Sequence, residues 1–218
     1  MLSIILKVLL AMLTVTFVTQ TVYAERRNLN FVMTIWSRFR VQMFFEVFGM
    51  LLVTILFCAL LMQCPLFKYG WMDLFFVNGG SLFIAPVIDA AGASNHFARI
   101  LPFMFILFLL VAMPFWARNE EKSFREGNYE WPDIIKESIV FGLVHCLMGV
   151  PLGAGIVLIG VGFFYACKYR KTFLKELDNH GNWHRAEKEA VLVSTTYHTL
   201  YNTMVVFVLT VAMWQSQH

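Results

Sequence analysis

The chain has 218 residues, of which 59% are hydrophobic and 14% are charged, and its mean hydropathy is +0.65. Soluble domains carry about a quarter charged residues, so this composition is typical of an integral membrane protein. The formal net charge is only +3, and the sequence holds neither a basic block nor a glycine-rich phosphate loop. Nucleic acid is therefore excluded as an expected partner.

Apolar runs that could cross a bilayer recur along the chain. A transmembrane helix needs about 20 mostly apolar residues, within a range of about 17–25. Runs near this length cover residues 4–24, 41–62, 100–117, 134–150, 152–167 and 191–214. Residues 74–91 form an ambiguous further segment, because NGGS and APV interrupt it. The sequence thus predicts an all-α, polytopic bundle of six to seven membrane segments, which forms a single domain with the lipid bilayer as its surroundings.

The first run has two interpretations. Val22-Tyr23-Ala24 resembles a small-residue cleavage site, so residues 1–24 form either a signal peptide or a retained helix. The run is longer than the apolar core of a typical signal peptide. This length favours a retained transmembrane helix.

One carboxylate lies inside a predicted span. Glu46 falls within the run of residues 41–62. A carboxylate that faces lipid is costly. We therefore expect Glu46 either near the membrane interface or facing other helices.

The placement of lysine and arginine predicts the orientation in the membrane. Basic residues gather in two loops: Arg26, Arg27, Arg38 and Arg40 in the first, and Lys168, Arg170, Lys171, Lys175, Arg185 and Lys188 in the second. Both loops are expected on the cytoplasmic side. They share a side only if residues 74–91 do not cross the membrane, or enter it as a re-entrant pair. Residues 118–133 then face the cytoplasm as well.

Two glutamates and an arginine follow the apolar run of residues 100–117. Glu121 and Arg125 are four residues apart, so they share a helix face and can form an ion pair. Glu120 lies about 100° around the helix from Glu121 and points elsewhere. Because Gly127 and Pro132 follow closely, the helix is expected to end soon after Arg125.

Two histidines complete the set of candidate functional residues. His145 follows Phe141 by four residues, and His198 precedes Asn202 by four, so each pair shares a helix face. A carboxylate beside a histidine can polarise a water for attack on a carbonyl. A second histidine and an amide can donate hydrogen bonds to the oxyanion that forms. Taken singly, the same residues are explained by a solvated loop or by polar helix packing.

The three spacings together resemble a known pattern. Glu120-Glu121-x-x-x-Arg125, Phe141-x-x-x-His145 and His198-x-x-x-Asn202 are similar to the three motifs of the CAAX prenyl endopeptidase and bacteriocin-processing (CPBP, or Abi) family of intramembrane proteases. Phe124, directly before the arginine, also matches that pattern. The resemblance covers about residues 115–208. Residues 1–99 match only as apolar helices, which leaves residues 100–218 as the expected catalytic core.

The resemblance implies a role for each motif residue. Glu120 would activate water with the help of His145, while His198 and Asn202 would stabilise the oxyanion. Glu121 and Arg125 would form the supporting ion pair, and Phe141 would pack beneath the helix of His145. It implies a glutamate-dependent endopeptidase without a cofactor, whose site opens toward the cytoplasm. Its substrate would be a membrane-embedded or lipidated protein.

Two other functions stay open. A proteolytically inactive relative of the family would act as a scaffold, chaperone or accessory subunit in a complex of membrane proteins. A zinc enzyme would use Glu120, His145 and His198 as ligands, because three protein ligands and a water form a catalytic zinc site. The sequence lacks an HExxH helix, and Arg125 is a poor neighbour for a dication.

Overall fold

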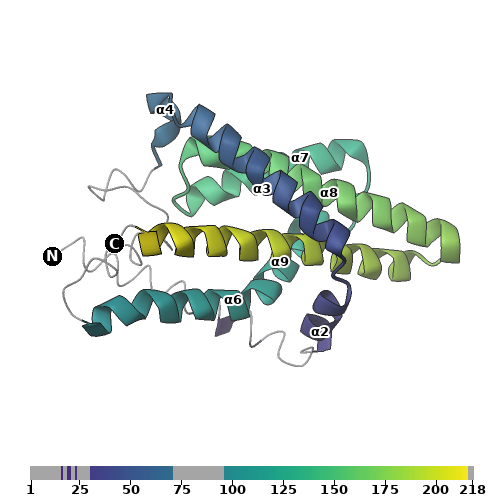
Figure 1. Cartoon of the computed structure of the whole chain (residues 1–218). Helices are drawn as coiled ribbons and strands as arrows, with labels where there is room; N and C mark the ends of the chain where they lie inside the picture. Colours follow the sequence, from purple (N-terminus) through teal and green to yellow (C-terminus); the bar gives the residue numbers. More distant parts are fainter. Residues whose placement is uncertain (1–15, 17–18, 21–22, 24–29, 71–95, 216–218) are drawn as a thin grey trace.

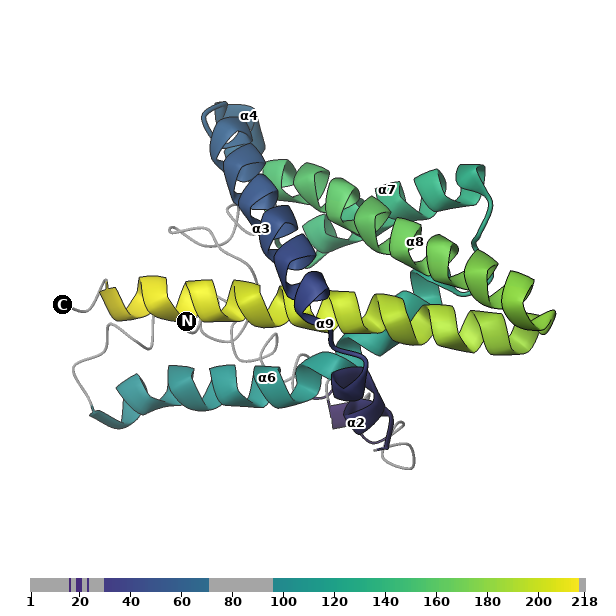
Figure 2. The same cartoon turned by 45° about the vertical axis from the view of Figure 1, so that its right-hand side comes forward.

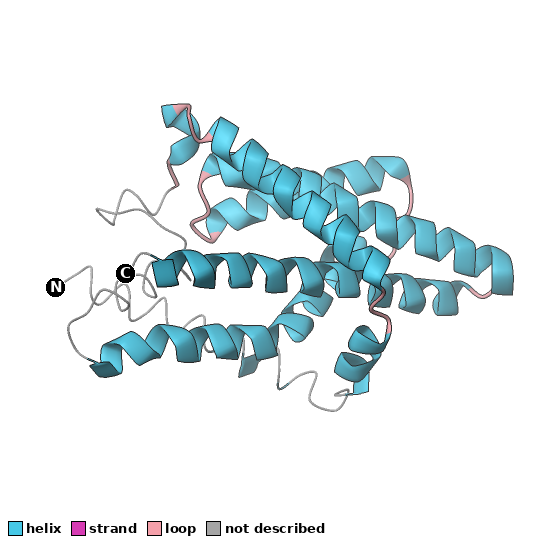
Figure 3. Ribbon diagram, viewed as in Figure 1, coloured by secondary structure: helices cyan, strands magenta, loops and turns pink. Residues whose placement is uncertain are grey.

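In a computed structural model of the protein, residues 30–70 and 96–215 are described, together with residues 16, 19, 20 and 23. These residues form seven helices and no strand (Figure 3). The helices are α2 (Asn30–Ser37), α3 (Val41–Leu61), α4 (Pro65–Lys68), α6 (His96–Arg125), α7 (Trp131–Leu147), α8 (Leu152–His180) and α9 (Trp183–Gln215). The predicted all-α class is confirmed. The predicted segment of residues 74–91, and that of residues 4–24 apart from the four residues named, lie outside the described part.

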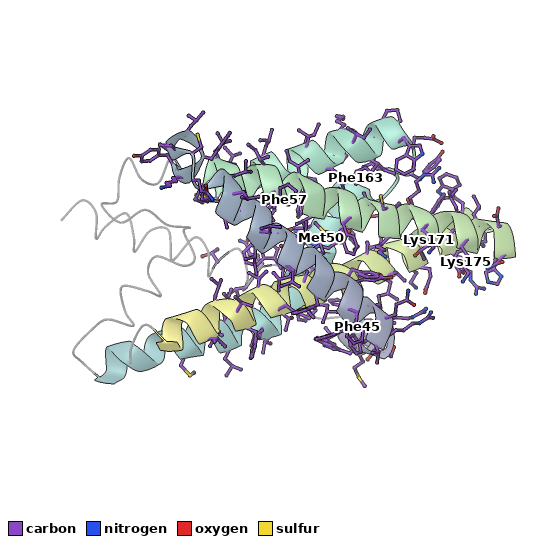
Figure 4. The ribbon with its side chains drawn as sticks, turned by 45° about the horizontal axis from the view of Figure 1, so that its top comes forward. Phe45, Met50, Phe57, Phe163, Lys171 and Lys175 are labelled. Atoms are coloured by element: carbon purple, nitrogen blue, oxygen red, sulfur yellow. The ribbon has the colours of Figure 1, made fainter. Side chains whose placement is uncertain are left out.

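Two of the described helices, α3 and α8, are long and apolar enough to cross a membrane. The buried residues of α3 follow one stripe at helical spacing, namely Met43, Val47, Leu51 and Thr54. Most of its other side chains are apolar and exposed, and Phe45 and Phe57 project outward from α3 (Figure 4). A helix that is apolar all round but packed along one stripe is typical of a bilayer or another large apolar surface.

The helices pack around α9, the longest of them. α8 and α9 form an antiparallel hairpin, α7 lies against α8, and α6 runs beside α9 (Figure 1). α3 crosses over α8 and α9 (Figure 2). The main buried cluster lies where these helices meet, and it includes Val47 of α3, Phe141 of α7 and Tyr165 of α8. The three motif segments are therefore carried by neighbouring helices.

Two helix ends show how the local sequence acts. α6 ends at Arg125, and Gly127 follows with a φ of +81°, a left-handed conformation that glycine adopts without strain. This agrees with the predicted end of the helix. α8 ends in the same way at Gly181, whose φ is +60° and whose N–H donates to the Leu177 carbonyl.

The polar segment of residues 168–189 differs from the expectation that it forms a loop. α8 continues through Lys168 to His180, and α9 already begins at Trp183. The physical reason is an apolar stripe within the charged sequence, because Tyr169 and Phe173 of α8 are buried against Ala186 and Ala190 of α9. The charged residues occupy the outer faces of a helical hairpin.

Two polar contacts tie α3 and the turn before it to α8 and α9. Glu46 accepts hydrogen bonds from Lys168 of α8, at 2.6 Å, and from the Tyr197 hydroxyl of α9. It faces other helices, which is one of the two placements expected for it. Arg38, in the turn before α3, forms a bidentate ion pair with Glu189 of α9. The parts of the two basic segments that carry Arg38 and Glu189 thus lie side by side.

The backbones of α7 and α8 approach closely at two glycines. A Cβ on Gly142 would lie 2.5 Å from the Gly155 carbonyl oxygen and 2.7 Å from the Ile159 nitrogen. Both of those atoms belong to the backbone and cannot rotate away. The α7–α8 contact therefore requires a glycine at position 142.

We predict that Gly142→Ala destabilises the fold by about 1–3 kcal/mol, because the added methyl group pushes two helices apart. The measurement is the thermal unfolding midpoint of the purified protein in detergent. The matched control is Gly160→Ala in α8, where a new Cβ would meet no heavy atom within 4 Å. Replacing this glycine should leave the midpoint unchanged or raise it, because alanine favours a helix. Equal midpoints for the two variants would contradict the close approach.

Candidate functional site

His198 of α9 lies between the two glutamates of α6. Its Nδ1 is 2.8 Å from Glu121 Oε1, and its Nε2 is 3.5 Å from Glu120 Oε2. Glu121 and His198 are buried, whereas the Glu120 side chain keeps 16% of its surface exposed. Each nitrogen of the imidazole therefore faces a carboxylate, and only Glu120 is open to a ligand.

The buried Glu121 carboxylate has a cation beside it on its own helix. Arg125 Nε is 3.8 Å from Glu121 Oε2, and both side chains are 1% exposed. This is the pair that the spacing of four residues predicts. Burial disfavours the charged carboxylate, but the hydrogen bond with His198 and the charge of Arg125 outweigh it, so the pKa of Glu121 lies below its ordinary value. Glu121 is therefore ionised at neutral pH.

Phe141 of α7 joins the parts of the site. Its ring centroid is 4.6 Å from that of His145 and 5.8 Å from that of His198, and the Arg125 guanidinium lies 5.1 Å from it. Phe141 thus does more than pack beneath the helix of His145, since it also contacts His198 and covers the arginine. The three motifs meet at this ring.

His145 is held by its own helix. Its Nδ1 lies 2.7 Å from the Phe141 carbonyl oxygen, so this nitrogen carries a proton and donates it. The neutral ring then presents Nε2 as an acceptor. His145 is half-buried, and it can accept a hydrogen bond from water.

The polar contact of Glu120 is with His198. The resemblance implies that Glu120 acts with the help of His145. Within the described residues, no hydrogen bond or ion pair joins Glu120 to His145, and the contact of Glu120 is with His198. The reason is that α6 packs along α9, which brings both glutamates to the face of α9 that carries His198. Asn202 lies one turn further along α9, half-buried, and its side chain forms no hydrogen bond with any described residue.

Two residues of α8 at the site belong to none of the three motifs. Tyr165 stacks on the His198 imidazole, with ring centroids 4.6 Å apart and an interplanar angle of 22°. Gly162, one turn earlier, lets α8 approach, because a Cβ there would be 2.8 Å from Phe141 Cδ1 and 3.1 Å from Arg125 Nη2. In the sequence, these two residues are marked only by their spacing of three within the apolar run of residues 152–167.

Buried polar atoms that lack a hydrogen bond gather at this site. Among the described residues, six buried side-chain atoms have no hydrogen-bond partner within the protein, and they are Glu120 Oε2, Glu121 Oε2, Arg125 Nε and Nη2, Tyr165 Oη and Thr199 Oγ1. All of them surround His198 or belong to its neighbour in sequence. Buried polar groups are normally hydrogen-bonded. The site therefore has the donors and acceptors to bind water or a peptide group.

The zinc alternative finds no support in this geometry. In the part of the chain that the structure describes, no three His, Cys, Asp or Glu side chains are arranged to hold a metal ion. His198 Nδ1 is bonded to Glu121, and His145 Nδ1 is bonded to the Phe141 carbonyl. The expected ligand set of Glu120, His145 and His198 does not converge on one point.

Comparison of the chain with protein-family models, with curated proteins and with solved structures finds no match in any of the three. The resemblance to the CPBP family therefore rests on the three motif spacings. The contacts of His198 with Glu120 and Glu121 do not depend on that resemblance.

We predict that Arg125→Ala and Glu120→Gln have different effects on the stability of the fold. Arg125→Ala leaves the buried Glu121 carboxylate without its cation, and breaking a buried ion pair costs about 3–5 kcal/mol. Glu120→Gln keeps the shape of a side chain that is partly exposed, so it should change stability little. The yield of folded protein and the thermal unfolding midpoint measure both effects. Equal midpoints for Arg125→Ala and Glu120→Gln would show that Glu120 and Glu121 do not have separate roles.

Proposed function

We propose that this protein is an intramembrane endopeptidase of the CAAX-protease (CPBP) type, which uses a glutamate-activated water to cleave a membrane-associated protein. The observation that carries the proposal is the position of His198, buried between Glu120 and Glu121 at the contact of α6 and α9. Residues 77 apart in the chain come together there, in a cluster that also includes Phe141 of the remaining motif.

The two carboxylates have different surroundings, which supports different roles. Glu121 is fully buried and bonded to His198, so it fixes the imidazole with Nε2 toward Glu120. Glu120 keeps an exposed edge, while its buried Oε2 faces His198 Nε2 at 3.5 Å and has no hydrogen bond to any described residue. A carboxylate that takes a proton from water must be within hydrogen-bond reach of that water. Glu120 is thus the better general base, and Glu121 positions the histidine.

The proposed reaction is hydrolysis of a peptide bond. Glu120 accepts a proton from water, and the water oxygen bonds to the carbonyl carbon of the peptide. The carbonyl oxygen becomes an oxyanion. The Asn202 amide donates a hydrogen bond to it, and so does Nε2–H of His198, whose ring carries a proton on both nitrogens in this step because Nδ1–H is donated to Glu121. The C–N bond then breaks, and Glu120 returns the proton to the leaving amine. The products are a carboxylate and an amine.

The surface supports a membrane location for this chemistry. The exposed side of α3 is apolar along its length, and Phe163 of α8 adds to it (Figure 4). Lys171 and Lys175 lie further along α8, toward the hairpin end (Figure 4). An apolar band with lysines beyond it is typical of a helix that leaves the bilayer on the cytoplasmic side. We propose six to seven membrane segments, a site facing the cytoplasm, and a membrane-embedded or lipidated substrate.

One observation favours a second candidate function. No hydrogen bond or ion pair joins Glu120 to His145 in the described structure. If no water bridges them, the pair cannot act together as the family resemblance implies. A proteolytically inactive protein that serves as a scaffold, chaperone or accessory subunit for membrane proteins would then keep the cluster as a packing element.

Cleavage of reporters in proteoliposomes tests the first proposal. The substrates are membrane-anchored and prenylated peptides with a fluorophore and quencher on opposite sides of the expected cut. We predict that the wild-type protein cleaves at least one of them, and that Glu120→Gln lowers kcat by about 10²-fold or more, as expected for a lost general base. Zinc chelation should leave the rate unchanged.

The matched control for this assay is Glu126→Gln, which alters an exposed glutamate just beyond the end of α6. It should keep the wild-type rate. Folded wild-type protein that cleaves no reporter, or a Glu120→Gln variant as active as the wild type, would refute the peptidase and favour the scaffold.

We also predict that residues 40 and 171 lie on one side of the membrane. Arg40 and Lys171 are exposed, and the neighbouring Arg38 contacts Glu189 of the hairpin. The test places single cysteines at these positions in a chain whose four native cysteines are replaced. In sealed vesicles, a membrane-impermeant maleimide should label both sites from the same face. Labelling from opposite faces would contradict the proposed topology.

A further inference from the structure

Tyr165 is built into the site but has no role in the three motifs. It is fully buried, and its ring is stacked on the His198 imidazole, with centroids 4.6 Å apart. Phe141 and Tyr201 meet the same ring edge-on, at 6.3 Å and 6.1 Å. The ring therefore supports one face of His198 and is itself held by the core.

The hydroxyl of Tyr165 is the informative part. It is buried and has no hydrogen-bond partner among the described residues. Burying an unpaired polar group destabilises a fold. A phenylalanine would fill the same space and make the same ring contacts without that cost. A tyrosine at such a position is therefore best explained by a partner that is bound during function.

The surroundings of this hydroxyl point to the reacting centre. Tyr201, Glu121, Glu120 and Arg125 all interact with it electrostatically. Arg125 Nη2 and Glu120 Oε2 are also buried and have no hydrogen bond to any described residue. Donors and acceptors that need a partner thus surround the same imidazole from α6 and α8. A small polar group bound there would satisfy several of them together.

We propose that Tyr165 is a further residue of the site, whose ring positions the His198 imidazole and whose hydroxyl hydrogen-bonds to the reacting water or to the peptide group. This inference rests on the proposed peptidase function. It assigns separate tasks to the two parts of one side chain, and each task can be removed separately. Tyr165→Phe removes the hydroxyl alone, and Tyr165→Leu removes the aromatic stack as well.

The first experiment compares Tyr165→Phe with Tyr197→Phe, which makes the same change at the residue next to His198. The Tyr197 hydroxyl is bonded to Glu46 on α3, outside the site. Tyr165→Phe should keep or raise the thermal unfolding midpoint and lower kcat by about tenfold to a hundredfold, with KM little changed. Tyr197→Phe should lower the midpoint, because its hydroxyl does have a partner.

The second experiment does not depend on proteolysis. Diethyl pyrocarbonate modifies accessible imidazoles, and peptide mass spectrometry reports the rate at each histidine. His198 is buried, and His184 is exposed and serves as the internal reference. His198 should stay protected in the wild type and in Tyr165→Phe. It should react at a rate close to that of His184 in Tyr165→Leu, provided that the variant unfolds cooperatively.

The outcomes separate the two proposals. A wild-type protein without activity, together with exposure of His198 only in Tyr165→Leu, would refute the peptidase but keep the positioning role of the ring. An active wild type with an unchanged kcat in Tyr165→Phe would overturn the role of the hydroxyl. A folded Tyr165→Leu that still protects His198 would overturn the role of the ring.

Discussion

The buried charge of Glu121 is the constraint on which the arrangement of α6, α7 and α9 depends. A carboxylate removed from water is costly unless a cation and hydrogen bonds compensate it. Arg125 supplies the cation from the same helix, and His198 supplies the hydrogen bond from α9. Because one partner lies on another helix, the charge can be buried only when α6 and α9 are packed together. The contact between these helices and the burial of the charge therefore form as one event.

Aromatic rings and glycines complete the shell around this charge. Phe141 and Tyr165 exclude water from the histidine, and they do so because Gly142 and Gly162 let α7 and α8 come close. A low-polarity shell strengthens every electrostatic interaction inside it. Within the described residues, the same shell leaves several buried polar atoms without a hydrogen bond, which lowers stability. Such a concentration of polar atoms without hydrogen bonds around His198 is typical of a functional site.

Local features of this fold were predictable from sequence, and contacts between distant helices were not. The pairing of Glu121 with Arg125 and the end of α6 before Gly127 follow from spacing and backbone preferences within one turn. The contact of His198 with Glu121 joins residues 77 apart, so no periodicity contains it. Tyr165 belongs to no motif, and its role depends on how α8 packs. The helical hairpin of residues 168–189 was not predicted, because its many charged residues indicate a loop although Tyr169 and Phe173 form a buried apolar stripe among them.

Two adjacent residues of α9 fix how this helix is rotated. Tyr197 is bonded to Glu46 of α3, and His198 is bonded to Glu121 of α6. Consecutive residues point about 100° apart on a helix, so α9 is held from two directions at the same level. A rotation of α9 that released His198 would also break the contact with Glu46, whose other partners are Gln42 of its own helix and Lys168 of α8. The outer helix α3 contributes no residue to the site. Through Glu46 it nevertheless helps to hold His198 in position between Glu120 and Glu121.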